Sequence, residues 1–234
     1  MEENTYGIAF RFAQKIARLL LPRYRFERPP VLGKPVVYVS HHQNMVGPIS
    51  ILAWVKYYVR TWVLAEFTDR KAAYNHYSTV TFYERYDWPK WLAKMVAWPA
   101  SYIAPWVVNR ADAIPVYRKS RKIIQTMKIS HDTLMSGESI LIFPDIDYSN
   151  DSQMTSDIYQ GFLHLEKRYF KETNEHLTFV PIFSDSKEKV IRVGNEVKFT
   201  GEEQFNQERE KIARKIREEL NQLAQIKNKR GYKL

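Results

Sequence analysis

Short β-rich segments alternate with helical segments along most of this chain, and this alternation restricts the fold more than any other feature. Four runs have the length and the composition of buried strands: residues 35–40 (PVVYVS), 113–118 (AIPVYR), 139–144 (SILIFP) and 177–184 (LTFVPIFS). An amphipathic helix is expected at 120–138, between the second and third runs. Strands that alternate with helices indicate an α/β fold, so we expect a mixed, mostly parallel sheet flanked by helices.

The first 26 residues contain an amphipathic segment that we expect to form a basic helix ended by Pro22. Apolar residues recur at helical spacing at Ile8, Phe12, Ile16, Leu19 and Leu20. Arginine and lysine occupy the other face, which is typical of a helix that lies in a membrane interface. The same pattern fits equally well a helix that packs on the protein's own core.

A second segment, residues 87–108, contains four tryptophans and three prolines. We expect the prolines to break it into short helical pieces. Tryptophan and tyrosine rings favour the headgroup level of a bilayer, so this segment is a second candidate for membrane contact. The alternative is a hydrophobic cap over a ligand groove.

The composition narrows the class of protein. The net charge of +10 favours an anionic partner, and the 14% of aromatic residues suit a membrane interface at least as well as a nucleic acid. The absence of cysteine excludes disulfides, a thiolate nucleophile and cysteine metal sites. An intracellular protein is the simplest explanation of this composition. We expect no spanning helix, because no run reaches about 18–20 apolar residues. We expect no signal peptide, because the first residues include Glu2 and Glu3 and no compact apolar core followed by small residues.

Four segments in order resemble the motifs of one enzyme family. They are SHHQNMVGPIS (40–50), AIPVYRKSRK (113–122), GESILIFPDID (137–147) and TFVPIFS (178–184). Together they resemble the PlsC-like glycerolipid (1-acylglycerol-3-phosphate) acyltransferases, over roughly residues 33–200. The resemblance implies the α/β fold of that family and transfer of a fatty acyl group from acyl-CoA or acyl-carrier protein to the hydroxyl of a lysophospholipid.

The resemblance also assigns two catalytic residues. The family histidine falls on His42, which would act as general base; the alternative is a structural imidazole that caps the next helix. The family aspartate, five residues later, falls on Gly47, so this chain is a divergent member that lacks the motif carboxylate. Asp145 stands in place of the third motif's glutamate and is the best candidate for a substitute carboxylate. The alternative, that Asp145 is only an acidic residue of a turn, fits about equally well.

Substrate contacts follow from the same comparison. Arg118 matches the arginine that contacts the acceptor phosphate, and the alternative is the solvated start of a basic helix. Phe143 and Pro144 match the third motif, while His41 is expected to be structural or to contact substrate. Asn44 is able to orient a histidine through its amide. No metal and no tightly bound cofactor are implied, because the acyl donor is a co-substrate.

Other functions remain open. A lipid-binding pseudoenzyme on the same scaffold needs no base and would explain Gly47. The short Asp145-x-Asp147 motif after a strand also resembles the metal loop of glycosyltransferases or the nucleophile loop of a phosphatase, and we rank both lower. Nucleic acid is not expected as a partner, because no motif for it is present.

We therefore divide the chain into three parts. Residues 1–30 are the membrane-surface helix, 31–200 the acyltransferase-like domain and 201–234 a charged C-terminal helix. The expected partners are an anionic phospholipid surface, a lysophospholipid acceptor and the acyl donor. The expected location is the cytoplasmic face of the cell membrane, on which the protein lies as a peripheral, monotopic enzyme.

Overall fold

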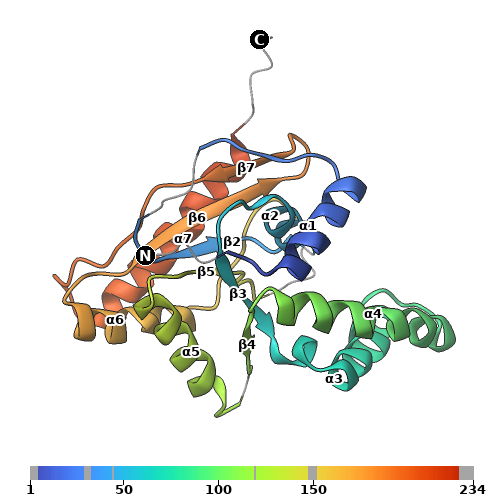
Figure 1. The fold of residues 1–234 in the computed structure, drawn as a ribbon. Helices are drawn as coiled ribbons and strands as arrows, with labels where there is room; N and C mark the ends of the chain where they lie inside the picture. The colour runs from blue at the N-terminus through green and yellow to red at the C-terminus, as the bar shows by residue number, and fades with distance from the viewer. Residues whose placement is uncertain (1–4, 29–32, 44, 119, 147–151, 227–234) are drawn as a thin grey trace, which may run out of the picture. The chain divides into compact units, whose positions relative to one another are not determined.

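The computed structural model describes residues 5–28, 33–43, 45–118, 120–146 and 152–226 (Figure 1). The chain forms two compact units. The first consists of Met1–Ile16 with Tyr57–Ile140, and the second of Ala17–Lys56 with Leu141–Leu234. Helix α1 (Ile8–Leu20) begins in the first unit and ends in the second.

Within the described residues, seven strands form a sheet with the order β1-β7-β6-β2-β5-β3-β4. Their bounds are β1 (Arg25–Phe26), β2 (Val36–Ser40), β3 (Val59–Leu64), β4 (Ile114–Val116), β5 (Ser139–Ile142), β6 (Thr178–Asp185) and β7 (Val190–Val193). The pairs β1–β7, β2–β6 and β3–β4 are parallel, whereas β6–β7 is antiparallel. The expected mixed, mostly parallel sheet is confirmed.

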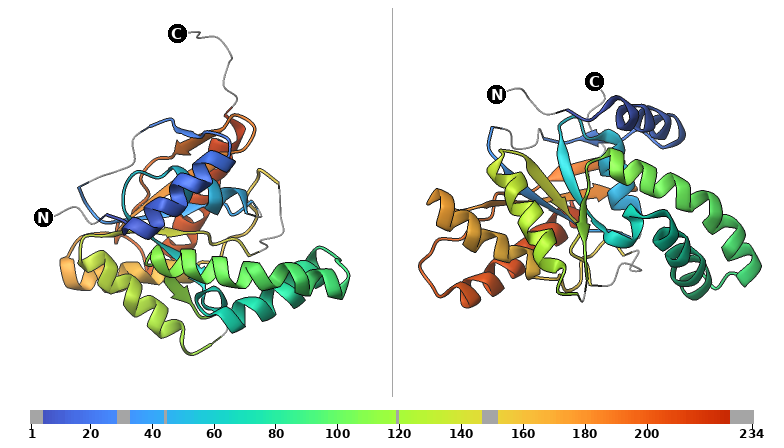
Figure 2. Two further views of the ribbon diagram at one scale, coloured as in Figure 1. Left: turned by 45° about the vertical axis from the view of Figure 1, so that its right-hand side comes forward. Right: turned by 60° about the horizontal axis from the view of Figure 1, so that its bottom comes forward.

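The core of the second unit is built on β2 and β6. Every residue of both strands is buried, and Ser40 lies opposite Ile182 in the parallel register. Strands buried on both faces need helices on each side, which agrees with their continuous apolar runs. The helices and 3-10 turn of this unit are α2 (Val46–Trp54), η3 (Gly161–His164), α6 (Leu165–Thr173) and α7 (Phe205–Gln225). They are visible around the strands in Figure 2.

The first unit contains a helical hairpin between β3 and β4. Its elements are η1 (Ala65–Thr68), α3 (Arg70–Asn75), the π-helix η2 (His76–Arg85) and α4 (Lys90–Arg110), and α5 (Ile123–Met135) follows β4. Helix α4 runs beside α3 and η2 in every view (Figures 1 and 2).

The prolines of the tryptophan-rich segment do not divide it, so that expectation is wrong. Pro99 and Pro105 both lie inside the single 21-residue helix α4. The buried face of α4 carries Ala93, Ala97 and Ser101 beside Pro105, and it packs on the rest of the hairpin. Burial of this small-residue face offsets the hydrogen bonds that the prolines remove, because tertiary packing overrides local propensity.

A buried ion pair holds β6 and β7 together. Arg192 is fully buried, and its guanidinium donates to the Asp185 carboxylate at 2.7 Å. Burial alone would raise the pKa of Asp185. The hydrogen bonds from Arg192 and from the backbone N–H groups of Glu188 and Lys187 outweigh burial and lower that pKa.

Substituting Asp185→Asn should lower the free energy of unfolding by about 3–5 kcal/mol, because it leaves the Arg192 charge buried with much less compensation. The same substitution at Asp132, whose exposed carboxylate pairs with Lys128 one turn away on α5, should change stability little. Urea unfolding of both variants measures the difference, and equal losses would contradict this account.

Candidate active site

The two adjacent histidines lie in a tight loop between β2 and α2. The backbone N–H of Val46 donates to the Gln43 carbonyl, and the N–H of Gly47 donates to the His42 carbonyl, each at 3.1 Å. Gln43 adopts a left-handed conformation, with φ of 46°. The loop therefore turns sharply at the carboxyl end of a buried strand, where α/β proteins commonly place binding residues.

Asp145 joins this loop to the segment after β5. Strand β5 ends at Ile142, and Asp145 follows three residues later with its side chain almost completely buried. One carboxylate oxygen lies 2.5 Å from Nδ1 of His41, and the other accepts the backbone N–H of His42 at 2.7 Å. Both oxygens of Asp145 thus act on the histidine loop.

The ring of His41 is the closest partner of the Asp145 carboxylate in the loop. Its second ring nitrogen, Nε2, lies 2.9 Å from the carbonyl oxygen of Ser152, so both nitrogens face acceptors. Burial opposes the charge of His41, but the hydrogen bond and charge of Asp145, with the Ser152 carbonyl, outweigh it and raise the pKa. An imidazolium that donates on both sides has no lone pair left, so this placement favours the structural alternative for His41.

His42 is the more accessible histidine of the two. It is half-buried, whereas His41 is 1% exposed. The ring of His42 meets the Phe143 ring edge-on, with centroids 5.7 Å apart and planes at 82°. Phe143 and the backbone bond to Asp145 therefore both help to fix the position of His42.

Gly47 is required by the backbone of the loop. A Cβ atom at this position would lie 2.3 Å from the His41 carbonyl oxygen and 3.0 Å from that of His42. Both distances are shorter than a carbon tolerates, so no side chain fits without movement of the main chain. The aspartate expected from the motif is thus absent from a position that has no room for it.

The remaining predicted residues are placed as follows. The carbonyl of Pro144 accepts the N–H of Tyr159 at 2.7 Å, and this bond fixes the segment before Asp145. Arg118 belongs to the first unit, two residues after β4, and its part in a common site stays a prediction. Asn44 and Asp147 lie outside the described residues, among which no cluster of histidine, aspartate or glutamate suits a metal.

Two features of the loop were not expected from the sequence. The Ser152 carbonyl, the second acceptor of His41, carries no sequence signal because any residue type supplies a backbone oxygen. Gln43 is 4% exposed, and its amide nitrogen has no partner among the described residues. The Gly47-Pro48 pair that follows is a residue pattern typical of turns.

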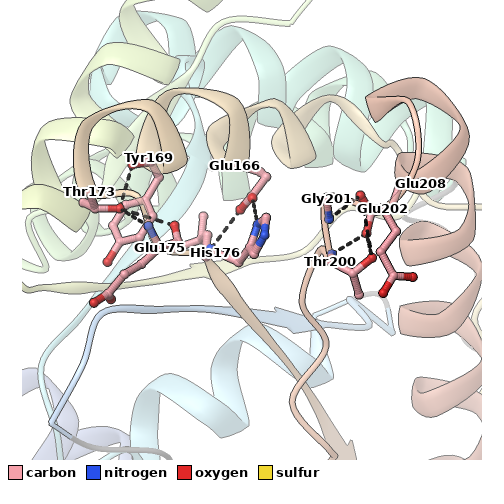
Figure 3. Close-up of polar contacts among 10 residues, drawn as sticks. Glu166, Tyr169, Thr173, Glu175, His176, Thr200, Gly201, Glu202 and Glu208 are labelled. Carbon is pink, nitrogen blue, oxygen red and sulfur yellow. Dashed lines mark hydrogen bonds and ion pairs between the residues drawn. The ribbon is translucent and has the colours of Figure 1, made fainter.

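A second histidine–carboxylate pair lies at the start of β6 (Figure 3). Glu166 contacts Nδ1 of His176 at 2.6 Å and accepts the N–H of Leu177 at 2.8 Å. Burial, together with the nearby Glu208 charge, raises the pKa of Glu166 despite these bonds. In the parallel register Thr178 lies opposite Val36, at the far end of β2 from His41. This pair therefore anchors the strand start and is separate from the histidine loop.

Comparisons with known proteins address the fold. No protein-family model matches this chain, and no curated protein sequence matches it. A solved structure that it resembles is the 1-acyl-sn-glycerophosphate (LPA) acyltransferase PlsC from Thermotoga maritima, with a TM-score of 0.56 and 10% sequence identity. The likeness covers 94% of this chain and 80% of that one. This chain has the PlsC fold. The expected fold is confirmed, and at this identity the motif assignments stay predictions.

The loop geometry predicts the effect of adding side chains to this PlsC fold. Gly47→Ala should lower the free energy of unfolding by about 1–3 kcal/mol, because the new methyl group overlaps backbone oxygens. Gly47→Asp should be at least as destabilising and should not create a working carboxylate. Gly7→Ala is the control, since nothing lies within 4 Å of a Cβ there. Unchanged urea midpoints for the Gly47 variants would show that the loop is looser than described.

The His41–Asp145 pair should make stability depend on pH. The folded pKa of His41 lies above its unfolded value of about 6.5. The contribution of the pair is therefore complete below about pH 6.5 and is lost as pH rises through the raised pKa. In the Asp145→Asn variant, burial still disfavours the charged form of His41. The loss of stability with rising pH should therefore become smaller or change sign. Urea unfolding of both proteins from mildly acidic to mildly alkaline pH tests this, and identical pH slopes would refute it.

Proposed function

We propose that this protein is an acyltransferase that moves a fatty acyl group from acyl-CoA or acyl-carrier protein to the hydroxyl of a lysophospholipid. The observation that carries the proposal is the half-buried His42 at the carboxyl end of β2, held through its main chain by Asp145 on a PlsC fold. A neutral imidazole at such a place suits proton transfer near neutral pH.

In the proposed reaction His42 accepts the proton of the acceptor hydroxyl while the oxygen attacks the thioester carbonyl. A new ester bond forms, the carbon–sulfur bond breaks, and the thiolate leaves with the proton returned by the imidazolium. The positive charge of His41 next to it would oppose the formation of that imidazolium. Asp145 removes this obstacle because it neutralises His41 at 2.5 Å.

Turnover is expected to be slow. The motif carboxylate that would stabilise the His42 imidazolium is replaced by Gly47, and loss of such a group lowers the rate by orders of magnitude without abolishing it. In this protein the bond from Asp145 to the backbone of His42 and the edge-on contact with Phe143 orient the loop instead.

The acceptor would be recognised by charge and by apolar contact. We assign the phosphate to Arg118, whose guanidinium follows the short strand β4. Large apolar side chains close in sequence to the histidine loop are exposed: Met45, Val46, Ile49 and Ile146. Such a surface suits a substrate that carries an acyl chain.

We further propose that the protein works as a peripheral, monotopic enzyme on the cytoplasmic face of an anionic membrane. The apolar face of α1 is exposed, with Ile8 86% and Leu19 85% accessible, which supports the interfacial alternative for this helix. Within the described residues, no helix has the length and apolar character that crossing a bilayer requires.

A lipid-binding protein without turnover is the second candidate. It is favoured by Gly47, because the backbone leaves no room there for the carboxylate of the motif. Binding an acyl chain and a phosphate requires neither a base nor its carboxylate.

The test is mass spectrometry of the lipids formed from lysophosphatidic acid and isotope-labelled acyl-CoA or acyl-carrier protein on anionic vesicles. His42→Ala should reduce labelled phosphatidic acid at least about a hundredfold, the usual range for a general base. His164→Ala removes an exposed histidine of η3 and should leave the rate unchanged. Equal product from His42→Ala would exclude His42 as base. No product from the wild-type protein, despite vesicle binding, would favour the second candidate.

A further inference from the structure

Helix α4 carries an exposed stripe of large apolar side chains. Its members are Trp91, Met95, Trp98, Tyr102, Ile103 and Trp106. Apart from Ile103, they recur every three or four residues and so lie along one side of the helix, and Trp91 is 68% exposed. A set of this size on the surface of a water-soluble monomer generally marks a contact with a partner or a membrane.

Helix α4, which carries the stripe, is well packed on its other side. The other side of α4 buries Ala93, Ala97 and Ser101 against the hairpin. Near the tip of the hairpin the rings of Phe82 and Trp88 stack at 4.9 Å with planes 9° apart. The exposed rings therefore result from the orientation of a packed helix, and not from a loose segment.

Two grooves border the stripe, and each places at least one cationic side chain beside a tryptophan. The first has a volume of about 540 Å³, and Trp106 and Arg110 line it together with Ile8 and Phe12 of α1. In the second, of about 500 Å³, Trp98 lies with Arg70 and Lys71. Asp69 also lines the second groove, where its carboxylate accepts the N–H of Ala72 at the start of α3.

The first groove joins α4 to the beginning of α1. The hydroxyl of Tyr6 donates to the Val59 carbonyl at 2.8 Å and accepts the Val59 N–H at 3.2 Å, which fixes the start of α1 to β3. Tyr6 also packs on Phe10, with ring centroids 4.5 Å apart. Ile8 and Phe12 are left exposed next to Trp106.

The charge of this surface has one sign along both helices. Residues 90–110 contain Lys90, Lys94 and Arg110 and no acidic residue, and residues 8–20 contain three basic residues and no acidic residue. Tryptophan and tyrosine together with lysine and arginine are the side chains that favour the headgroup level of an anionic bilayer. A second copy of this chain is a poorer occupant, because a two-fold contact through α4 would bring the same cations together.

We propose that α4 is a binding surface for anionic membranes, continuous with the first half of α1 through the Trp106 groove. Trp91 and Trp98 lie at the headgroup level, and the neighbouring lysines and arginines contact lipid phosphates. This surface lies wholly within the first unit, whereas the histidine loop belongs to the second. The proposal does not depend on acyl transfer.

The experiment measures partitioning of the full chain onto phosphatidylcholine vesicles with and without phosphatidylglycerol. The double variant Trp91→Ser/Trp98→Ser should bind anionic vesicles at least about tenfold more weakly, because two large apolar side chains no longer enter the interface. Ile124→Ser removes a side chain of α5 that is 72% exposed, and it should bind as wild type. Circular dichroism confirms that each variant is folded.

Quenching of tryptophan fluorescence by bromine-labelled lipids measures how deeply the tryptophans enter the bilayer. These lipids should quench the fluorescence of the wild-type protein, and Trp91→Phe/Trp98→Phe should reduce that quenching clearly, with the remainder due to Trp106. Trp62→Phe is the matched control, since Trp62 is 9% exposed and donates to Ser130 inside the first unit at 2.8 Å. Quenching should persist in that control.

Two outcomes would overturn the proposal. In the first, the α4 variant binds as wild type while Ile8→Ser/Phe12→Ser abolishes binding, so that α1 acts alone. In the second, the wild-type protein forms a dimer without vesicles that the α4 variant loses, so that the stripe faces a second copy. The His42→Ala variant should bind vesicles as wild type, so failure of the proposed catalysis and failure of this surface are distinguished.

Discussion

The proposed site depends on the two hydrogen bonds of the Asp145 carboxylate. The carboxylate bonds the ring of His41 and the backbone N–H of His42, and so it ties the segment after β5 to the end of β2. Neither charge of the pair would be tolerated alone in so buried a place, so each requires the other. The net charge of the His41–Asp145 pair is zero. Next to this pair, His42 is half-buried beside Phe143, in a position where proton transfer is chemically possible.

Gly47 and Asp145 together change the interpretation of the missing motif aspartate. A carboxylate at position 47 would collide with the carbonyl oxygens of the histidine loop. The carboxylate that is present comes from the other side of the loop and acts on its backbone and on His41. The protein therefore orients His42 by fixing its main chain, which is weaker support for a developing imidazolium than a direct carboxylate contact.

The proposed base and the proposed membrane surface are assigned to different parts of the chain. The histidine loop with Asp145 belongs to the second unit, and the aromatic stripe of α4 with its grooves belongs to the first. Helix α1 contributes residues to both units and exposes its apolar face. The proposed membrane binding therefore does not require the proposed turnover, which makes the two proposals separable by mutation.

Residue pattern alone determined the fold class, because strands and helices of this chain follow their local periodicity. The resemblance to the acyltransferase motifs, and not residue type, singled out His42 and Asp145, with His41 beside them. Tertiary structure decided which groups these residues contact. The pairing of Asp145 with His41, 104 residues apart, follows from strand order and loop shape. Likewise, the contacts that keep α4 helical through Pro99 and Pro105 come from distant packing, which no local sequence rule contains.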